Sequence, residues 1–91
     1  MRLSAKQVER IAAAVAEPRR FRILKQLAAS AAPLSCGSIT EHQKVTGATI
    51  SHHLKELEAA ELIHSVREGK YNLISFRRDV WEAYLATLSA L

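Results

Sequence analysis

The stretch Thr46–Leu57, TGATISHHLKEL, predicts a helix with one packed face and one exposed face. At about 100° per residue, its large apolar side chains share a narrow stripe, and small or polar side chains point the opposite way. The stripe consists of Ile50, Leu54 and Leu57, and the opposite face carries Ala48, His52, Lys55 and Ala59. The Thr46 hydroxyl can cap the helix start, and the small Gly47 and Ala48 keep its first turn slim enough for a groove floor. We interpret the stretch as a helix that enters DNA.

A second short helix is predicted directly upstream. Ser38–Glu41 has the Ser-x-x-Glu form of a capping box, which marks a helix start. The link Lys44–Thr46 is short enough to join the two helices into a helix-turn-helix.

Composition limits the class of protein. A chain of 91 residues should form one domain, 1–91, near the size at which a single core is marginally stable and a partner subunit helps. Hydrophobic residues make up 48%, but no apolar run approaches the roughly 18 residues that span a bilayer, so we expect no membrane partner and a cytoplasmic location. The single cysteine, Cys36, fits a reducing compartment.

Charge favours a polyanionic partner in total more than in distribution. The net charge is +4, and residues 1–25 hold seven Lys and Arg against two Glu. Residues 44–70 hold four Lys and Arg against four Glu, so the DNA-reading segment is locally neutral. DNA binding would then depend on which of these charges face the duplex, and a solvated mixed-charge surface is the alternative.

Two more helices are predicted before the helix-turn-helix. Ser4–Gln7 is a capping-box form, and helical apolar spacing extends this first helix to about residue 16. Pro18 suits the first turn of the next helix. Its buried side should consist of Phe21, Ile23, Leu24 and Leu27. The N–H groups at its start, helped by Arg19 or Arg20, are a candidate phosphate site, with solvated arginines as the alternative.

A β-hairpin should follow the helix-turn-helix. Leu62–Arg67 and Lys70–Phe76 read as two strands around Glu68 and Gly69, and the glycine supplies the positive φ of a tight turn. Arg67 and Lys70 lie near the tip, where they can contact a phosphate backbone or a minor groove.

The final predicted helix, about 78–90, is more apolar than one core stripe requires. Its surplus suggests burial against a second copy of the chain, with an ordinary core helix as the alternative. The side chains concerned are Trp81, Tyr84, Leu85 and Leu88.

Three segments carry a family resemblance: Glu17–Leu24, Thr49–Ile63 and Arg67–Lys70. In the residues of these segments, their order and their spacing, the chain resembles the arsenic-repressor (ArsR/SmtB) family of winged-helix transcription regulators. The resemblance implies a homodimeric repressor whose first and last helices, about 4–16 and 78–90, form the subunit interface. From the first helix it adds Val8, Ile11 and Val15 to that interface.

The resemblance also assigns DNA contacts to Gly47, Ala48, Ser51 and His52. The chain departs from the family at Gly47 and Ala48, where polar side chains are frequent. The full expected DNA-contacting set is Thr46, Gly47, Ala48, Thr49, Ser51, His52, Lys55, Arg67 and Lys70. His53 lies at the rim of the packed face and is interpreted as structural.

No metal or other cofactor is expected. By resemblance, the Cys-x-Cys pair of metal sensors would fall at Ser35 and Gly37, and one thiolate at Cys36 is too few for a soft-metal site. A site built from Cys36, His42 and His64 is the alternative. Cys36 is instead a candidate redox switch, because a helix start can lower a thiol pKa, with an inert cysteine as the default.

The sequence thus predicts a mainly α winged helix-turn-helix with a two-stranded wing, in the order helix, helix, helix, recognition helix, β-hairpin, helix. It contains no phosphate-cradling glycine loop and no nucleophile–base pair, so we expect no enzyme. The expected partners are double-stranded DNA and a second copy of the chain, and the effector is unknown. The alternative function is a winged-helix module that binds another protein and no DNA.

Overall fold

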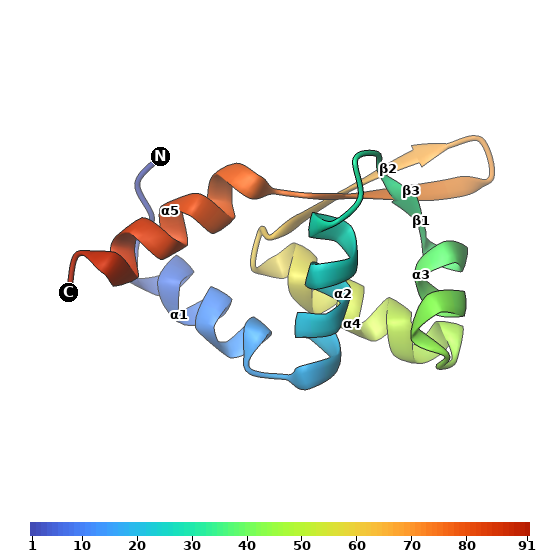
Figure 1. The fold of residues 1–91 in the computed structure, drawn as a ribbon, viewed down its shortest axis with the longest axis horizontal. Coiled ribbons are helices and arrows are strands. Elements are labelled where there is room, and N and C mark those ends of the chain that lie inside the picture. The colour runs from blue at the N-terminus through green and yellow to red at the C-terminus, as the bar shows by residue number, and fades with distance from the viewer.

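The computed structural model describes residues 1–91 and confirms the predicted order of elements, with one short strand added. The helices are α1 (Ala5–Val15), α2 (Pro18–Ala28), α3 (Cys36–Gln43), α4 (Gly47–Ala59) and α5 (Arg78–Ser89). The strands are β1 (Leu34–Ser35), β2 (Ile63–Glu68) and β3 (Tyr71–Phe76). In Figure 1 the β2–β3 hairpin extends beyond α3 at one end of the molecule, while both termini lie at the other end with α1 and α5.

The three strands form one antiparallel sheet in the order β1-β3-β2. The β2–β3 hairpin is the predicted wing, and its turn consists of Gly69 and Lys70, one residue later than predicted. Gly69 has φ 61°, so the prediction of a positive φ at this position is confirmed. The two-residue β1 pairs Leu34 with Ile74 and was not predicted.

Most helix starts follow the predicted caps. Ser4 and Gln7 form both hydrogen bonds of a capping box, and the Thr46 hydroxyl accepts the Thr49 N–H at 3.2 Å. Pro18 occupies the first turn of α2, as predicted.

The predicted start of α3 at Ser38 is wrong. Ser35 is the N-cap, and its hydroxyl accepts the Ser38 N–H at 3.1 Å, so Ser38 lies inside the helix. Pairing of Ser35 in β1 holds its backbone extended, at ψ 154°, and this fixes where the helix begins.

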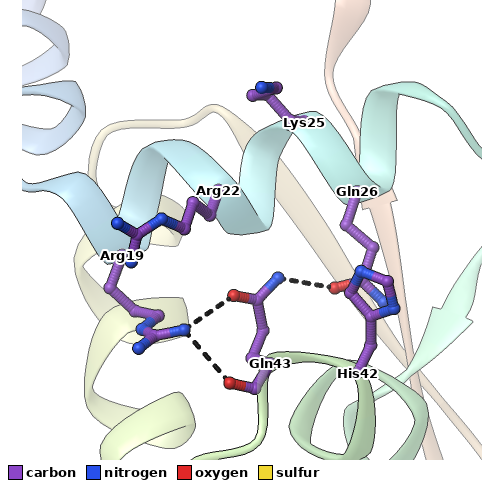
Figure 2. A pocket seen from close by; sticks show the side chains of 6 residues that line it. All are labelled: Arg19, Arg22, Lys25, Gln26, His42 and Gln43. Atoms are coloured by element: carbon purple, nitrogen blue, oxygen red, sulfur yellow. Dashed lines mark hydrogen bonds between the residues drawn. The ribbon is translucent and has the colours of Figure 1, made fainter.

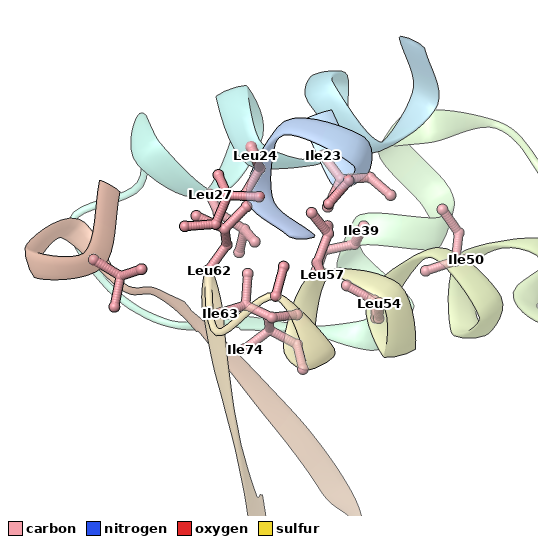
Figure 3. Packing of buried hydrophobic residues seen from close by; sticks show 14 of the residues in the cluster. Ile23, Leu24, Leu27, Ile39, Ile50, Leu54, Leu57, Leu62, Ile63 and Ile74 are labelled. Carbon is pink, nitrogen blue, oxygen red and sulfur yellow. The ribbon is translucent and has the colours of Figure 1, made fainter. Parts of the chain in front are cut away.

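One hydrophobic core lies between the helices and the base of the wing (Figure 3). The α4 stripe of Ile50, Leu54 and Leu57 is buried in it, as predicted, together with side chains from every other helix. The prediction that Phe21 is buried is wrong, because its side chain lies on the outer side of α2 and is 44% exposed.

The terminal helices divide their apolar side chains between this core and the surface. Ile11 is completely buried and Tyr84 almost so, so neither offers area to a partner subunit, and their assignment to the subunit interface is corrected here. Val8, Val15 and Trp81 are partly buried against the core, whereas Leu85 and Leu88 are exposed. None of the helices has the length and apolar character needed to cross a membrane.

Candidate nucleic-acid interface

The exposed face of α4 carries the side chains expected to contact DNA. Burial of Ile50 and Leu54 turns Ala48, His52 and Lys55 toward solvent, because these groups lie on opposite sides of the helix. Every member of the expected set is exposed: Thr46, Gly47, Ala48, Thr49, Ser51, His52, Lys55, Arg67 and Lys70. The structure therefore leaves all of them accessible to a duplex.

The turn into α4 is fixed by backbone and side-chain geometry. Lys44 adopts the left-handed conformation, with φ 57°, and its N–H donates to the Thr40 carbonyl at 3.0 Å. The chain then becomes extended at Thr46, whose hydroxyl lies 2.9 Å from that of Thr49. Gly47 has no atom near the place of a side chain, so a backbone or a base can approach the first turn of α4.

A polar cluster attaches α4 to the α1–α2 corner. The Arg20 side chain donates through Nε to the Ala14 carbonyl at 2.8 Å and lies 3.4 Å from His53 Nδ1 through Nη1. The Glu17 carboxylate accepts the Arg20 N–H at 2.9 Å and lies 3.8 Å from His53 Nε2. His53 is thus a structural residue at the rim of the core, in agreement with its predicted position.

The pKa values of His53 and Glu17 are both lowered in this cluster. Burial lowers the pKa of His53, and this outweighs the opposing attraction of the Glu17 carboxylate. The backbone hydrogen bond from Arg20 lowers the pKa of Glu17. Sequence reasoning missed the cluster, because the direction in which a long side chain such as Arg20 turns depends on the packing of α1, α2 and α4.

The candidate phosphate site formed by the N–H groups at the start of α2 is not supported by the structure. The Glu17 carboxylate already occupies a backbone N–H of the first turn and places a negative charge there. Arg20 is bound to the Ala14 carbonyl, and Arg19 donates away from the helix start, to Gln43.

The wing presents two cations at its tip. Arg67 Nε donates to the Gly69 carbonyl at 3.2 Å, and the Lys70 ammonium lies 5.5 Å from the centre of the Tyr71 ring. Both side chains remain exposed despite these contacts. The tip can therefore offer positive charge to a phosphate backbone.

Cys36 lies at the start of α3 and lines a cavity of about 400 Å³ between α3, α4 and the sheet, together with Ser51 and Lys55. Burial raises the pKa of the Cys36 thiol, so the expectation that the helix start lowers it is corrected. A raised pKa leaves less thiolate at neutral pH and makes the thiol less reactive.

The alternative metal site does not form. Nowhere does the structure bring three or more His, Cys, Asp or Glu side chains close enough to hold a metal ion, so Cys36, His42 and His64 do not cluster.

Two kinds of sequence comparison place the chain among known regulators. Residues 15–66 match the model of a helix-turn-helix domain family. The uncharacterized HTH-type transcriptional regulator YceK of Bacillus subtilis is 31% identical over 72 residues, which are 79% of this chain and 72% of that protein. The transcriptional repressor SdpR of Bacillus subtilis is 34% identical over 67 residues, which are 74% of this chain and 72% of that protein.

Solved structures agree with the sequence comparison. An ArsR-like transcriptional regulator from Rhodococcus superposes with a TM-score of 0.83 at 25% identity, over 93% of this chain and 78% of that one. A homodimeric winged helix-turn-helix DNA-binding domain from Mycobacterium bovis, a possible ArsR-family regulator, gives a TM-score of 0.78 at 26% identity over the same shares.

The buried histidine should make stability depend on pH. Because burial favours neutral His53, the unfolded chain binds more protons below the ordinary histidine pKa of 6.5. The free energy of unfolding should therefore fall as the pH drops from 7.5 to 5.5, a range that lies above the titration of Glu17. Urea unfolding at both pH values should show a smaller fall for His53→Gln than for the wild type.

His52→Gln is the matched control, because the neighbouring ring is exposed. It should retain the wild-type difference between the two pH values. Equal pH dependence in the two variants would contradict the assignment to His53.

Proposed function

The chain belongs to the ArsR family of winged helix-turn-helix transcriptional regulators, and we propose that it is a homodimeric repressor that binds an inverted-repeat operator. The observation that carries the proposal is the exposed face of α4 between its N-cap Thr46 and Lys55, held in a fixed rotation in a domain that also carries a cationic wing tip. A recognition helix with these properties fits the major groove. A regulator that binds DNA must reach the chromosome, which supports a cytoplasmic location.

We assign base reading to the outward side chains of α4. His52 and Ser51 can hydrogen-bond to base edges, while the methyl groups of Ala48 and Thr49 can contact a thymine methyl. Lys55 stands one turn further along on the exposed side of the helix, where an ammonium can reach a base or a phosphate. In the wing, Arg67 and Lys70 would position the protein through phosphates and carry little sequence information.

A dimer is supported by the surface of α5. Leu85 and Leu88 are 46% and 41% exposed and lie on the same side of this helix as the half-buried Trp81. Burial of such exposed apolar side chains against a second copy of the chain would stabilise a dimer. The Mycobacterium bovis relative is homodimeric, and a two-fold dimer would set two recognition helices about 34–36 Å apart, one helical turn of DNA.

The second candidate function is a protein-binding winged helix that does not bind DNA. The observation that favours it is the electrical neutrality of residues 44–70, where four cations face four glutamates. Binding to DNA decides between the two candidates.

Fluorescence anisotropy of the purified protein tests the DNA-reading assignment. The duplex comes from the upstream region of its own gene, and a scrambled duplex of equal composition is the control. The wild type should prefer the upstream duplex by about 10³-fold or more. His52→Ala should cost about 1–3 kcal/mol, and the loss should be confined to one base position of the operator.

Lys70→Ala is the contrasting variant. It should weaken binding to both duplexes alike and reduce the salt slope by about 1. Equal and weak binding of the wild type to both duplexes would favour the protein-binding function. A loss of affinity for His52→Ala that is the same for every sequence would make His52 a phosphate contact.

The proposed dimer is tested by sedimentation equilibrium of Leu85→Ser and Leu88→Ser. Full burial of a leucine is worth about 1.5–3 kcal/mol, and a partner would bury the roughly half of each side chain that is still exposed. Because each substitution occurs in both copies of a dimer, the two losses add, and each change should raise the dimer dissociation constant by about tenfold or more. Ala86→Ser changes an exposed residue on the side of α5 away from Trp81 and Leu88 and should leave the constant near its wild-type value. Unchanged association in both leucine variants would remove this face of α5 from the interface.

A further inference from the structure

A basic groove lies between α2 and α3, outside the surface formed by α4 and the wing. It has a volume of about 570 Å³, and its wall contains no apolar side chain and no carboxylate. Figure 2 shows that α2 supplies one side and the last turn of α3 the other. The lining residues are Arg19, Arg22, Lys25, Gln26, His42 and Gln43.

The positive charge of this groove is not neutralised by the protein. The structure contains two ion pairs, His53 with Glu17 and Arg77 with Asp79, and neither involves a groove residue. Arg22 and Lys25 are exposed and make no hydrogen bond to another part of the chain. Three cations that share a groove without an acidic neighbour fit a polyanionic ligand.

A hydrogen-bond relay orders the arginine at the inner end of the groove. Arg19 Nη1 donates to the backbone carbonyl and to the side-chain oxygen of Gln43, each at 3.1 Å. Gln43 is 9% exposed and donates through Nε2 to Gln26 Oε1 at 3.0 Å, as drawn in Figure 2. The relay engages one guanidinium nitrogen, so the remaining donors of a fixed Arg19 are available to a ligand.

The Arg19 end of the groove lies near the recognition helix, on the flank opposite the wing. Gln43 ends α3, and Thr46 caps α4 three residues later. Glu17 and Arg20, which lie close to Arg19 at the start of α2, both contact His53 of α4. The other flank of α4, with Ser51 and Lys55, faces the sheet across the cavity that Cys36 also lines.

A major groove is bounded by two phosphate strands, one on each side of an inserted helix. We propose that the α2–α3 groove binds the DNA phosphate backbone on the side of α4 opposite the wing. The assignment rests on the proposed DNA-binding function and extends it, because it adds a contact that reads no bases. Residues 44–70 carry no net positive charge, and the groove would supply it. This charge matters because phosphate contacts provide most of the salt-dependent affinity for DNA.

Arg22→Gln/Lys25→Gln tests the groove and leaves the Arg19 relay intact. The control Arg2→Gln/Lys6→Gln removes the same charge from exposed positions at the opposite end of the chain fold, before and within α1. Binding to the upstream and scrambled duplexes is measured over a range of salt concentrations. The groove variant should flatten the slope of log affinity against log salt by about 1–2 and weaken both duplexes alike, whereas the control should keep nearly the wild-type slope.

A slope equal to that of the control overturns the groove assignment. Equal binding of the wild type to both duplexes would contradict the proposed sequence-specific function. The salt slope of the groove variant would still decide whether the groove contacts DNA. The phosphate groups could also belong to a small anion. Thermal unfolding of the wild type and the groove variant with and without inorganic pyrophosphate tests this source. Stabilisation that the groove variant loses, combined with an unchanged DNA salt slope, overturns the DNA assignment in favour of a small-anion site.

Discussion

Burial of Ile50, Leu54 and Leu57 fixes the rotation of α4, and the surface that we propose faces DNA depends on that rotation. Each of these side chains is 7% exposed or less, and full burial of a residue of this type is worth about 1.5–3 kcal/mol. A turn of α4 large enough to hide His52 would expose this stripe. The Arg20–His53–Glu17 cluster adds a polar attachment on one flank, so the core and the cluster together hold the reading face outward.

In the proposed DNA complex, base reading and phosphate binding belong to different surfaces of the protein. The exposed face of α4 is small and polar and carries Lys55 as its one cation, which suits discrimination between bases better than strong attraction to phosphate. Positive charge is concentrated beside it, at the wing tip and in the α2–α3 groove. If the proposed phosphate contacts form, a duplex is held on both sides of α4.

Local chemistry made much of this architecture predictable. The phase of α4 follows from its apolar spacing, the Thr46 cap from its hydroxyl, and the wing turn from Gly69. Features that depend on tertiary contacts were missed. Ser35 competes with Ser38 as a cap and wins through strand pairing, and the directions of the Arg19 and Arg20 side chains are set by carbonyl groups that folding brings near.

The most direct measurement is a titration of ¹⁵N-labelled protein with the upstream duplex, followed by amide NMR. We expect the largest changes at residues 46–55 and 67–71, with further changes in α2 at Arg19–Lys25, and little change in α1 and α5. Changes confined to α1 and α5, or no change at saturating duplex, would contradict the claim that the exposed face of α4 binds DNA.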